Sequence, residues 1–524
     1  TLLLPSATRA ALLLLPGSGP IDRNGNAPGA TAPNHYALLA EALATQGVAT
    51  LRADKRGIGQ SGGDANAVTL DAYGADAAVL AGELRDRSAL PCIWLAGHSE
   101  GALVALRAAS DLGAVCGVNS AQQGVHGVSD SVELFVADVM AKTEGRADPT
   151  LARLIGEQSG ATLDWLNERH QVPLLLDFKW TGLGHSRPRL HIPPGRNGEE
   201  LLALLANACG RAGAEIVMEA RVIALYADAE DRVLGLQLQR PDGSVERLGC
   251  EALVLATCGF GGNHAMVANH IPEMATARYF GHEGNQGDGI RWGLELGAAV
   301  ADMTAYQGLG TLADPQQIIV PHPLMIEGGF LVNARGERFT HELANISGMC
   351  VPVLEQPGGV AWVVFDERRN QDCLAHSVEQ RQLREVGAIR SAASWAELER
   401  LCQLPEGSLA KENAAVNAAR QTDASDRLGR SFAGLEPLEP PYCAIRVTGA
   451  LFHTQGGLQI DSAARVLRPD GRPLPNLYAG GGAARSISGP AVTGYLPAVG
   501  LAMAITLGHI AGRAAAQQIQ LEVA

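Results

Sequence analysis

The segment LPNLYAGGGAA, residues 474–484, is an apolar run that leads directly into a turn of three consecutive glycines. The segment EALVLATCGFGGN, residues 251–263, has the same form, because an apolar run typical of a buried strand again ends in a turn of small residues. Turns without Cβ atoms let the backbone approach a ligand closely, as it does around a bound dinucleotide. Both segments therefore predict strand ends that line a nucleotide-sized ligand.

The length and composition of the chain limit the classes of protein to which it can belong. With 524 residues it exceeds one ordinary core, so we expect two or three domains. The hydrophobic share of 46% and the 62 glycines are typical of a globular α/β protein. The net charge of -14, without a run of Lys or Arg, argues against a nucleic-acid partner. We predict a small-molecule substrate.

The nine cysteines are scattered, without a CxxC pair or the spacing of metal ligands. This pattern predicts no metal site and favours a reduced, cytoplasmic location. The apolar start of the chain, residues 1–20, is interrupted by Arg9 and ends at Pro16, as a buried strand would. No apolar run is long enough to cross a bilayer, so we expect no membrane span.

The first part of the chain alternates apolar runs with helical patterns. The runs at 11–16, 48–54 and 92–97 are separated by helical stretches at 35–47 and 70–88. Such alternation predicts parallel strands joined by crossover helices. The third run ends in the turn GHSEG, whose glycines permit the strained bend that projects the central serine beside a helix N-terminus.

Three motifs in this part occur in a fixed order, namely PGSGPIDRNG at 16–25, DKRGIGQSGG at 54–63, and GHSEG around Ser99. Together they resemble the α/β-hydrolase superfamily, in its serine peptidase and esterase-like branch. The resemblance implies that Ser99 is a nucleophile, but the pattern stops near Ala109, before the Asp and His that would activate it. Residues 1–110 are predicted to be a truncated α/β-hydrolase-like segment, and a serine hydrolase using Ser99 remains the alternative function.

A different set of segments fills the rest of the chain. In order, they are GNQGDGIRWGLELGAAV (284–300), GGFLVNARGERFTHE (328–342), VTGALFHTQGGLQID (447–461), LPNLYAGGGAA (474–484) and GYLPAVGLAMAITLGHIAG (494–512). The set resembles the flavoprotein family of fumarate reductases and succinate dehydrogenases, which includes enoate reductases and ketosteroid dehydrogenases. The resemblance implies an FAD-dependent oxidoreductase that transfers a hydride between flavin and a C=C bond of a small unsaturated acid or enone.

The same resemblance implies a domain order. A discontinuous Rossmann-like FAD domain would comprise residues 111–263 and 441–524, interrupted by an α+β capping domain at 264–440. Substrate would bind between the cap and the flavin. The predicted fold class is therefore α/β, with a partial hydrolase βαβαβ unit, residues 1–110, joined to this FAD domain and its inserted cap.

Candidate catalytic residues follow from the resemblance. His453 and Thr454 would place two donors near the flavin, where the family binds a carboxylate or carbonyl, although a structural turn histidine is the alternative. Tyr495 stands, by counting, where the family has an Arg that clamps the substrate; it is either a proton carrier or a packed side chain. A family Arg and a family His that serve the substrate fall on Ile326 and Leu309. A strict fumarate reductase is therefore not expected.

The positions assigned to the cofactor lie on small-residue turns, in the strand and helices that precede them, and at the last helix. They are Ser120, Gly124, Val222, Ala256, Thr257, Gly259, Gly480, Gly481, Gly500 and Leu501. The helix that begins near Gly500 directs its positive end toward the electron-rich pyrimidine edge of a flavin. Because the chain has no haem-binding CxxCH and no iron–sulfur pattern, a separate electron donor or acceptor is expected.

The junction between the two parts departs from the flavoprotein pattern. That family opens with a strand, a GxGxxG turn, a helix and a ribose-binding acid, and here CIWLAGHSEGALVALRAA, residues 92–109, stands in their place. Our hypothesis is that this strand, turn and helix replace the missing unit, with pyrophosphate at Gly97–Gly101. Ser99 in place of the middle glycine and the missing acid both argue against tight FAD binding. An inactive fusion product is a further alternative.

Overall fold

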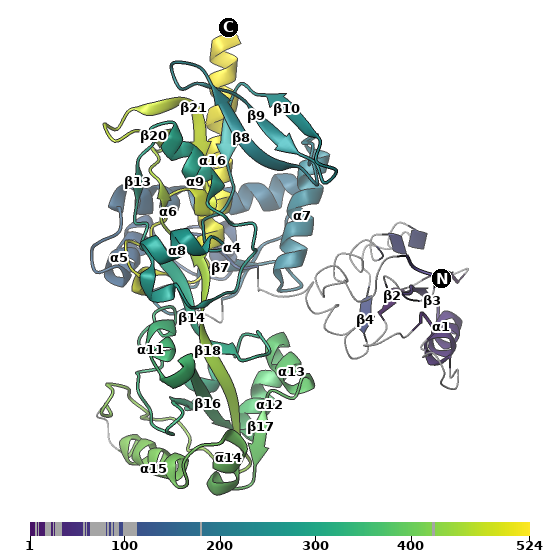
Figure 1. The fold of residues 1–524 in the computed structure, drawn as a ribbon, viewed down its shortest axis with the longest axis vertical. Coiled ribbons are helices and arrows are strands. Elements are labelled where there is room, and N and C mark those ends of the chain that lie inside the picture. Colours follow the sequence, from purple (N-terminus) through teal and green to yellow (C-terminus); the bar gives the residue numbers. More distant parts are fainter. Residues whose placement is uncertain are drawn as a thin grey trace. The chain divides into compact units, whose positions relative to one another are not determined.

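The structure of the chain is a computed structural model. It describes residues 1–5, 8, 10–15, 22–24, 26, 34–55, 58, 60–62, 80, 83–84, 87–88, 94–97, 113–178, 181–421 and 425–523. The chain divides into two compact units (Figure 1). The small unit comprises Thr1–Leu112 with Asn197–Glu199, and the large unit comprises Gly113–Arg196 with Glu200–Ala524.

A four-stranded sheet forms the small unit, in the order β1-β3-β2-β4. Its elements are β1 (Leu2–Leu3), β2 (Ala10–Leu15), α1 (His35–Thr45), β3 (Val48–Arg52) and β4 (Trp94–Gly97). Strand β2 is parallel to both β3 and β4, which confirms the predicted parallel pairing of the three apolar runs. Ala11, Leu13 and Ala49 on the strands and Ala40 on α1 are fully buried. Ser99 and the rest of the predicted elbow beyond Gly97 lie outside the described residues.

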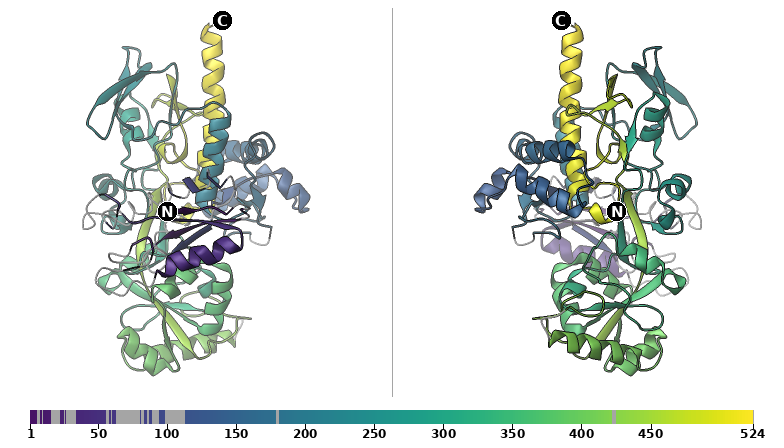
Figure 2. Two further views of the ribbon diagram at one scale, coloured as in Figure 1. Left: turned by 90° about the vertical axis from the view of Figure 1, so that its right-hand side faces the viewer. Right: turned by 90° about the vertical axis from the view of Figure 1, so that its left-hand side faces the viewer.

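In the large unit, a parallel strand pair joins distant parts of the sequence. Strand β11 (Leu253–Leu255) pairs with β21 (Pro473–Ala479), and β21 also pairs with β20 (Arg465–Leu467). The apolar residues of this pair continue into a core shared with α5 (Val132–Lys142), α6 (Pro149–His170) and α16 (Val499–Val523). Helix α6 packs beside α16 (Figure 2).

Helix α16 is apolar along most of its length. Among the described residues, Val499–Leu521 is the helix long and apolar enough to cross a membrane by length and composition. Its residues Ala502, Met503, Leu507 and Ala511 are nevertheless part of the core of the large unit. Burial against α6 and the strand pair therefore accounts for much of its apolar sequence.

Smaller elements surround this core. They are β5 (Val115–Cys116), α4 (Ala121–Val125), β6 (Leu175–Leu176), β7 (Leu190–Ile192), α7 (Gly198–Arg211), β8 (Arg221–Ala227), β9 (Val233–Gln239), β10 (Val245–Gly249), α8 (His264–His270), η1 (Pro272–Met274), α9 (Asp288–Glu295), β13 (Val300–Ala301), β19 (Gly457–Leu458), η3 (Gly481–Ala483) and η4 (Val492–Gly494). Strands β8, β9 and β10 form an antiparallel meander, and β5, β7 and β6 form a second small sheet.

In Figure 1 the large unit has an upper half, which contains the core and the strand pair described above, and a lower half, which is built around a second sheet. Strand β18 (Tyr442–Thr454) connects these two halves. In the lower half it pairs with β16 (Val360–Asp366), β17 (Arg390–Ala392) and β12 (Arg278–Tyr279), and β14 (Tyr306–Ala313) runs antiparallel along it. Its last residues reach the turns of the upper half, because Thr454 contacts the turn after β11. The strand therefore places one end of the lower-half sheet at the predicted cofactor site.

The other elements of the lower half pack on both faces of this sheet in two apolar clusters. They are α10 (Pro323–Ile326), β15 (Phe330–Val332), α11 (Cys350–Leu354), η2 (Pro357–Gly359), α12 (Glu367–His376), α13 (Val378–Glu385), α14 (Trp395–Cys402) and α15 (Ser408–Arg420). We use the word cap for this half. The predicted boundaries of the cap at 264 and 440 remain predictions.

A buried ionic cluster stabilises the cap. Glu342, which is fully buried, accepts hydrogen bonds from Arg338 at 2.9 and 3.0 Å and from Arg430 at 2.9 Å. Arg338 also pairs with Asp426. These arginines keep the pKa of Glu342 below its usual range despite burial of the carboxylate, so the cluster stays ionised.

We expect Glu342→Gln to lower the free energy of unfolding by about 3–5 kcal/mol at neutral pH, because it leaves two buried guanidinium groups without their shared carboxylate. Since the pKa of Glu342 is depressed in the fold, its contribution is present above the unfolded value and is lost as the pH falls. Denaturant unfolding over a pH series measures both effects. The exposed Glu355 provides a control, for which Glu355→Gln should change the free energy by less than about 0.5 kcal/mol. An equally small loss for Glu342→Gln would contradict this account.

Candidate functional site

His453 lies at the end of β18, where it faces Gln307 of β14 across the antiparallel ladder. The side chain of Gln455 holds its ring, since Gln455 Nε2 is 2.5 Å from His453 Nδ1. Ser488 Oγ in turn donates to Gln455 Oε1 at 3.0 Å. Burial lowers the pKa of His453 to about 4, so its imidazole is neutral near pH 7. When the Gln455 amide donates to Nδ1, the ring proton is left on Nε2.

Tyr495 meets His453 at the start of α16. The two ring centroids are 5.4 Å apart, and the ring planes are inclined by 77°. Gly500 lies beside both, because a Cβ added there would be 3.3 Å from His453 Cε1 and 3.6 Å from the Tyr495 hydroxyl. A glycine at this position therefore keeps the space between the two rings and the helix N-terminus free of a side chain.

Thr454 points to a different neighbour. Its Oγ1 accepts a hydrogen bond from the backbone N of Phe260 at 3.1 Å, and the residue is buried. This contact ties β18 to the turn after β11, across 194 positions of sequence. Thr454 therefore anchors that turn, and its role as a second donor to the substrate stays a prediction.

The two glycine-rich turns touch each other. A Cβ added at Gly482 would lie 2.7 Å from the backbone N of Gly259, so the turn after β21 has no room for a side chain at this point. The Gly480 amide donates to Leu255 O at 3.1 Å, and Gly481 has a left-handed conformation with φ +59°. Contact between the turns thus requires glycine at position 482, whereas the sequence suggested only an approach to the ligand.

The other predicted cofactor positions have varied surroundings. Thr257 Oγ1 accepts from the Gly289 amide at 3.2 Å, next to the start of α9. Ala256 is exposed, Leu501 is 40% exposed on α16, and Val222 pairs with Leu238 within the meander. The structure brings Ala256, Thr257, Gly259, Gly480, Gly481, Gly500 and Leu501 to the adjoining ends of β11, β21 and α16.

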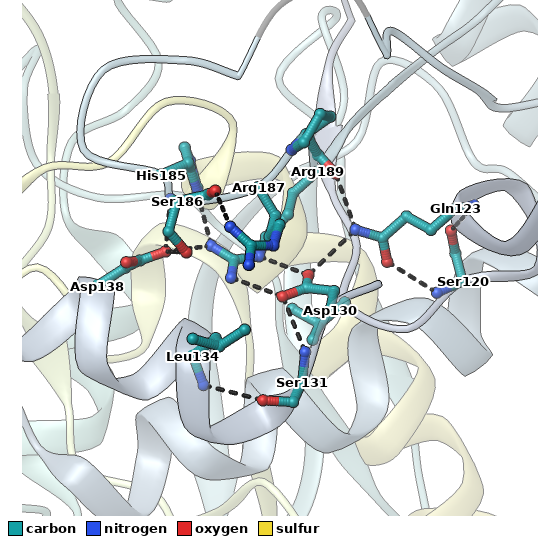
Figure 3. Close-up of polar contacts among 12 residues, drawn as sticks. Ser120, Gln123, Asp130, Ser131, Leu134, Asp138, His185, Ser186, Arg187 and Arg189 are labelled. Atoms are coloured by element: carbon teal, nitrogen blue, oxygen red, sulfur yellow. Dashed lines mark hydrogen bonds and ion pairs between the residues drawn. The ribbon is translucent and has the colours of Figure 1, made fainter. Parts of the chain in front are cut away.

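Ser120 begins α4 and is buried (Figure 3). Its Oγ accepts from the Gln123 amide at 3.1 Å, and the Gln123 side chain caps the Ser120 amide in return. The hydroxyl also lies 2.7 Å from His191 Nε2. Both partners are protein groups, so Ser120 shapes the local backbone. Gly124 on the same helix is exposed, with open space where a Cβ would be.

The described residues fit the flavin end of an FAD. Two touching turns at parallel strand ends, the N-terminus of a 25-residue helix and the space kept free at Gly500 lie together there. Such a helix end favours electron-rich groups. For the phosphate end of the cofactor, only Gly97 of the GHSEG turn is described, as the last residue of β4, so the predicted role of Gly97–Gly101 remains a hypothesis.

Sequence inspection missed three polar residues of the site. Gln455 and Ser488 orient His453, and Asn345 Nδ2 of the cap donates to Thr493 O at 2.8 Å, two residues before Tyr495. Gln455 stood within the HTQGG segment, which was a usable signal. Ser488 and Asn345 carry no comparable pattern.

Comparison with known families identifies the large unit. The model of the FAD binding domain family matches residues 95–494. The chain belongs to this FAD-binding family. A second model, of the serine aminopeptidase S33 family, matches residues 30–142. The chain is thus a composite of a flavoprotein with a hydrolase-like N-terminal part, as predicted.

Curated relatives have related activities. A probable fumarate reductase of Shewanella frigidimarina is 28% identical over 412 residues, which are 77% of this chain and 68% of that protein. An NADH:fumarate oxidoreductase of Klebsiella pneumoniae is 28% identical over 80% of this chain, but the match spans only 46% of that protein. A urocanate reductase of Eggerthella lenta is 27% identical over 77% of this chain and 67% of its own length.

Solved structures share the fold. The open conformation of a flavocytochrome c3 fumarate reductase superposes with a TM-score of 0.67 at 23% identity, covering 98% of this chain and 79% of that chain. A 3-ketosteroid-Δ4-(5α)-dehydrogenase from Rhodococcus jostii superposes with a TM-score of 0.62 at 25% identity, covering 78% and 89%. The family match and the relatives confirm the prediction of an FAD-dependent oxidoreductase and do not favour the serine hydrolase alternative.

We expect Thr454→Val to lower the free energy of unfolding by about 1–3 kcal/mol, because the buried Phe260 amide loses its acceptor. The flavin content of the purified protein should fall with it, since the turn after β11 is no longer anchored. Thr454→Ser keeps the hydroxyl and should retain most of the stability and most of the flavin content. Denaturant unfolding and the flavin absorbance per protein measure the two effects. A valine variant with unchanged stability would show that the hydrogen bond has no anchoring role.

Proposed function

We propose that this chain transfers a hydride between FAD and the C=C bond of a small unsaturated acid or cyclic enone, with His453 and Tyr495 at the substrate. The observation that carries the proposal is the edge-to-face pair of these rings beside Gly500, at the start of α16. The relatives, which include a probable fumarate reductase and a urocanate reductase, support this class of substrate. FAD, when bound, would supply or accept the hydride.

His453 is suited to bind an oxygen of the substrate. As a neutral imidazole with its proton on Nε2, it donates a hydrogen bond to a carbonyl or carboxylate conjugated with the double bond. This donation stabilises the negative charge that develops on that oxygen when a hydride adds to the distal carbon. Gln455 and Ser488 keep the ring in this orientation, so little reorganisation is needed during the reaction.

Tyr495 is suited to carry the proton. Addition of a hydride to one carbon of the double bond leaves a carbanion at the other carbon, which takes a proton. We assign that proton to the Tyr495 hydroxyl, which regains one from solvent after the reaction. In the opposite direction the same hydroxyl receives the proton that leaves the substrate.

The two side chains proposed to contact the substrate, His453 and Tyr495, are neutral, as are Gln455 and Ser488, which orient His453. Leu309, where the family has a His, is buried in β14. A dicarboxylate requires cationic partners to offset its desolvation. The observed set therefore favours an enone or a monocarboxylate over a dicarboxylate such as fumarate.

We further propose that electrons reach the flavin from a separate donor and that the chain works in the cytoplasm. The eight cysteines within the described residues are all free, as expected for a reducing compartment. We also propose that residues 1–110 are a partial α/β-hydrolase unit. The parallel strands β2, β3 and β4 and the serine aminopeptidase match over residues 30–142 support this assignment.

We expect Tyr495→Phe to lower kcat about 100-fold with little change in KM for a cyclic enone or an unsaturated monoacid, because the proton carrier is lost while His453 still binds the oxygen. Reductive turnover with a chemically reduced dye as donor measures both constants. Tyr226 on the exposed β8 strand provides the control, for which Tyr226→Phe should leave kcat unchanged. Full activity of Tyr495→Phe on every such substrate would contradict the assignment of Tyr495.

We expect the purified chain to bind FAD, seen by its absorbance, and to remain unlabelled by a fluorophosphonate, because a serine without a base is a weak nucleophile. Labelling that disappears in Ser99→Ala, in protein without flavin, would favour the serine hydrolase instead. Protein with neither signal after addition of FAD would indicate an inactive fusion product.

A further inference from the structure

The segment that leads from Tyr495 into α16 has contacts in addition to the one between the cap and Thr493. His185 Nε2 lies 3.0 Å from Pro497 O, and the Cys116 amide donates to Ala498 O at 3.2 Å. Ala498 has a left-handed conformation with φ +66°, which a β-carbon makes unfavourable. The bend before the helix is thus maintained by its neighbours, and His185 supplies the side-chain contact.

A buried ion cluster fixes the ring of His185 (Figure 3). Arg189 is fully buried and binds Asp130 through two hydrogen bonds of 2.7 and 2.8 Å. Its Nη1 donates to Asp138 at 2.5 Å and lies 3.4 Å from His185 Nδ1. Because a guanidinium can only donate, Nδ1 is the acceptor. The ring proton is therefore on Nε2, where it is donated to the Pro497 carbonyl.

Both carboxylates of this cluster are themselves oriented. Asp130 accepts from Gln123 Nε2 at 3.0 Å, and Asp138 accepts from the Ser186 amide at 2.8 Å and from its hydroxyl at 2.9 Å. A buried group of charges gains little net stability, since desolvation offsets most of the attraction. Its full set of partners instead gives it a single geometry, which it transmits to His185.

The backbone around His185 is shaped for this contact. Gly184 has φ +93°, and a Cβ added there would lie 2.7 Å from Leu496 Cδ2. Gly182 has φ +77°, and its added Cβ would be 3.7 Å from Pro497 Cβ. The loop that carries His185 therefore packs directly on the two residues that follow Tyr495.

We infer that His185 is a positioning residue for Tyr495, which it holds against His453 through the Pro497 carbonyl while the Asp130–Arg189–Asp138 cluster orients its ring. This inference rests on the proposed function, in which Tyr495 carries the proton. Displacement of a proton carrier by even about 1 Å costs a large part of the rate, because proton transfer requires hydrogen-bond distance. His185 itself contacts the segment between Tyr495 and α16, and it affects the reaction only through the position of Tyr495.

The test uses the full-length flavoprotein and two variants of His185. His185→Leu removes the donor, and we expect kcat to fall about tenfold with little change in KM. Amide hydrogen exchange in peptides covering residues 493–500 should become faster. His185→Gln offers an amide that accepts from Arg189 and donates to Pro497 O. This variant should therefore restore most of kcat and most of the slow exchange at residues 493–500. His264, which is exposed on α8, provides the control: His264→Leu should change neither kcat nor the exchange rate at residues 493–500.

A double variant separates this inference from the proposed function. In the Tyr495→Phe background, His185→Leu should cause no further loss of kcat, because its effect acts through the missing hydroxyl. Multiplied losses, or unchanged exchange at residues 493–500 in His185→Leu, would overturn the positioning role. If Tyr495→Phe alone is fully active, the proposed proton carrier is wrong, and the inference that depends on it is overturned as well. Hydrogen exchange at residues 493–500 then still shows whether His185 stabilises the segment between Tyr495 and α16.

Discussion

The contact between Gly259 and Gly482 is the constraint on which the site depends. A Cβ at Gly482 would come within 2.7 Å of the Gly259 amide nitrogen, and a Cβ at Gly259 would overlap Thr454 Oγ1, so both positions require glycine. Their contact brings the ends of β11 and β21 together and leaves Thr454 able to reach the Phe260 amide. Because Thr454 ends β18, the position of His453 one residue earlier follows from the same contact. The glycines therefore set the distance between the cap strand and the cofactor side.

Charge is distributed unevenly in the large unit. The fully buried Arg189 and the almost fully buried Arg338 and Arg430 are bound to carboxylates in ionic clusters, whereas the two rings beside Gly500, those of His453 and Tyr495, are neutral. Low dielectric strengthens a hydrogen bond from a neutral donor and makes an unpaired charge costly. The ionic clusters thus fix the geometry of the fold, while the residues that we propose for the substrate are neutral.

Much of the fold could be predicted because its signals are local. The NLYAGGG segment predicted a strand and a glycine turn, and β21 ends at Ala479 immediately before Gly480. His453 and Tyr495 were found as candidates because their segments resemble a known family, although their roles remain proposals. His185, Asn345 and Ser488 were not found, since each acts through a contact that has no sequence pattern. The His185 contact with Pro497, for example, joins residues 312 positions apart.

By itself, the sequence determined the class of protein, the order of its two parts and the glycine turns, because apolar periodicity and missing side chains act over a few residues. Only the tertiary structure decided which side chains act together. It brought Thr454 to the turn after β11, oriented His453 through Gln455, and placed the Asp130–Arg189–Asp138 cluster beside His185, which contacts Pro497. Those choices depend on packing between segments that are distant in the chain, where burial makes each polar group take whichever partner lies within reach.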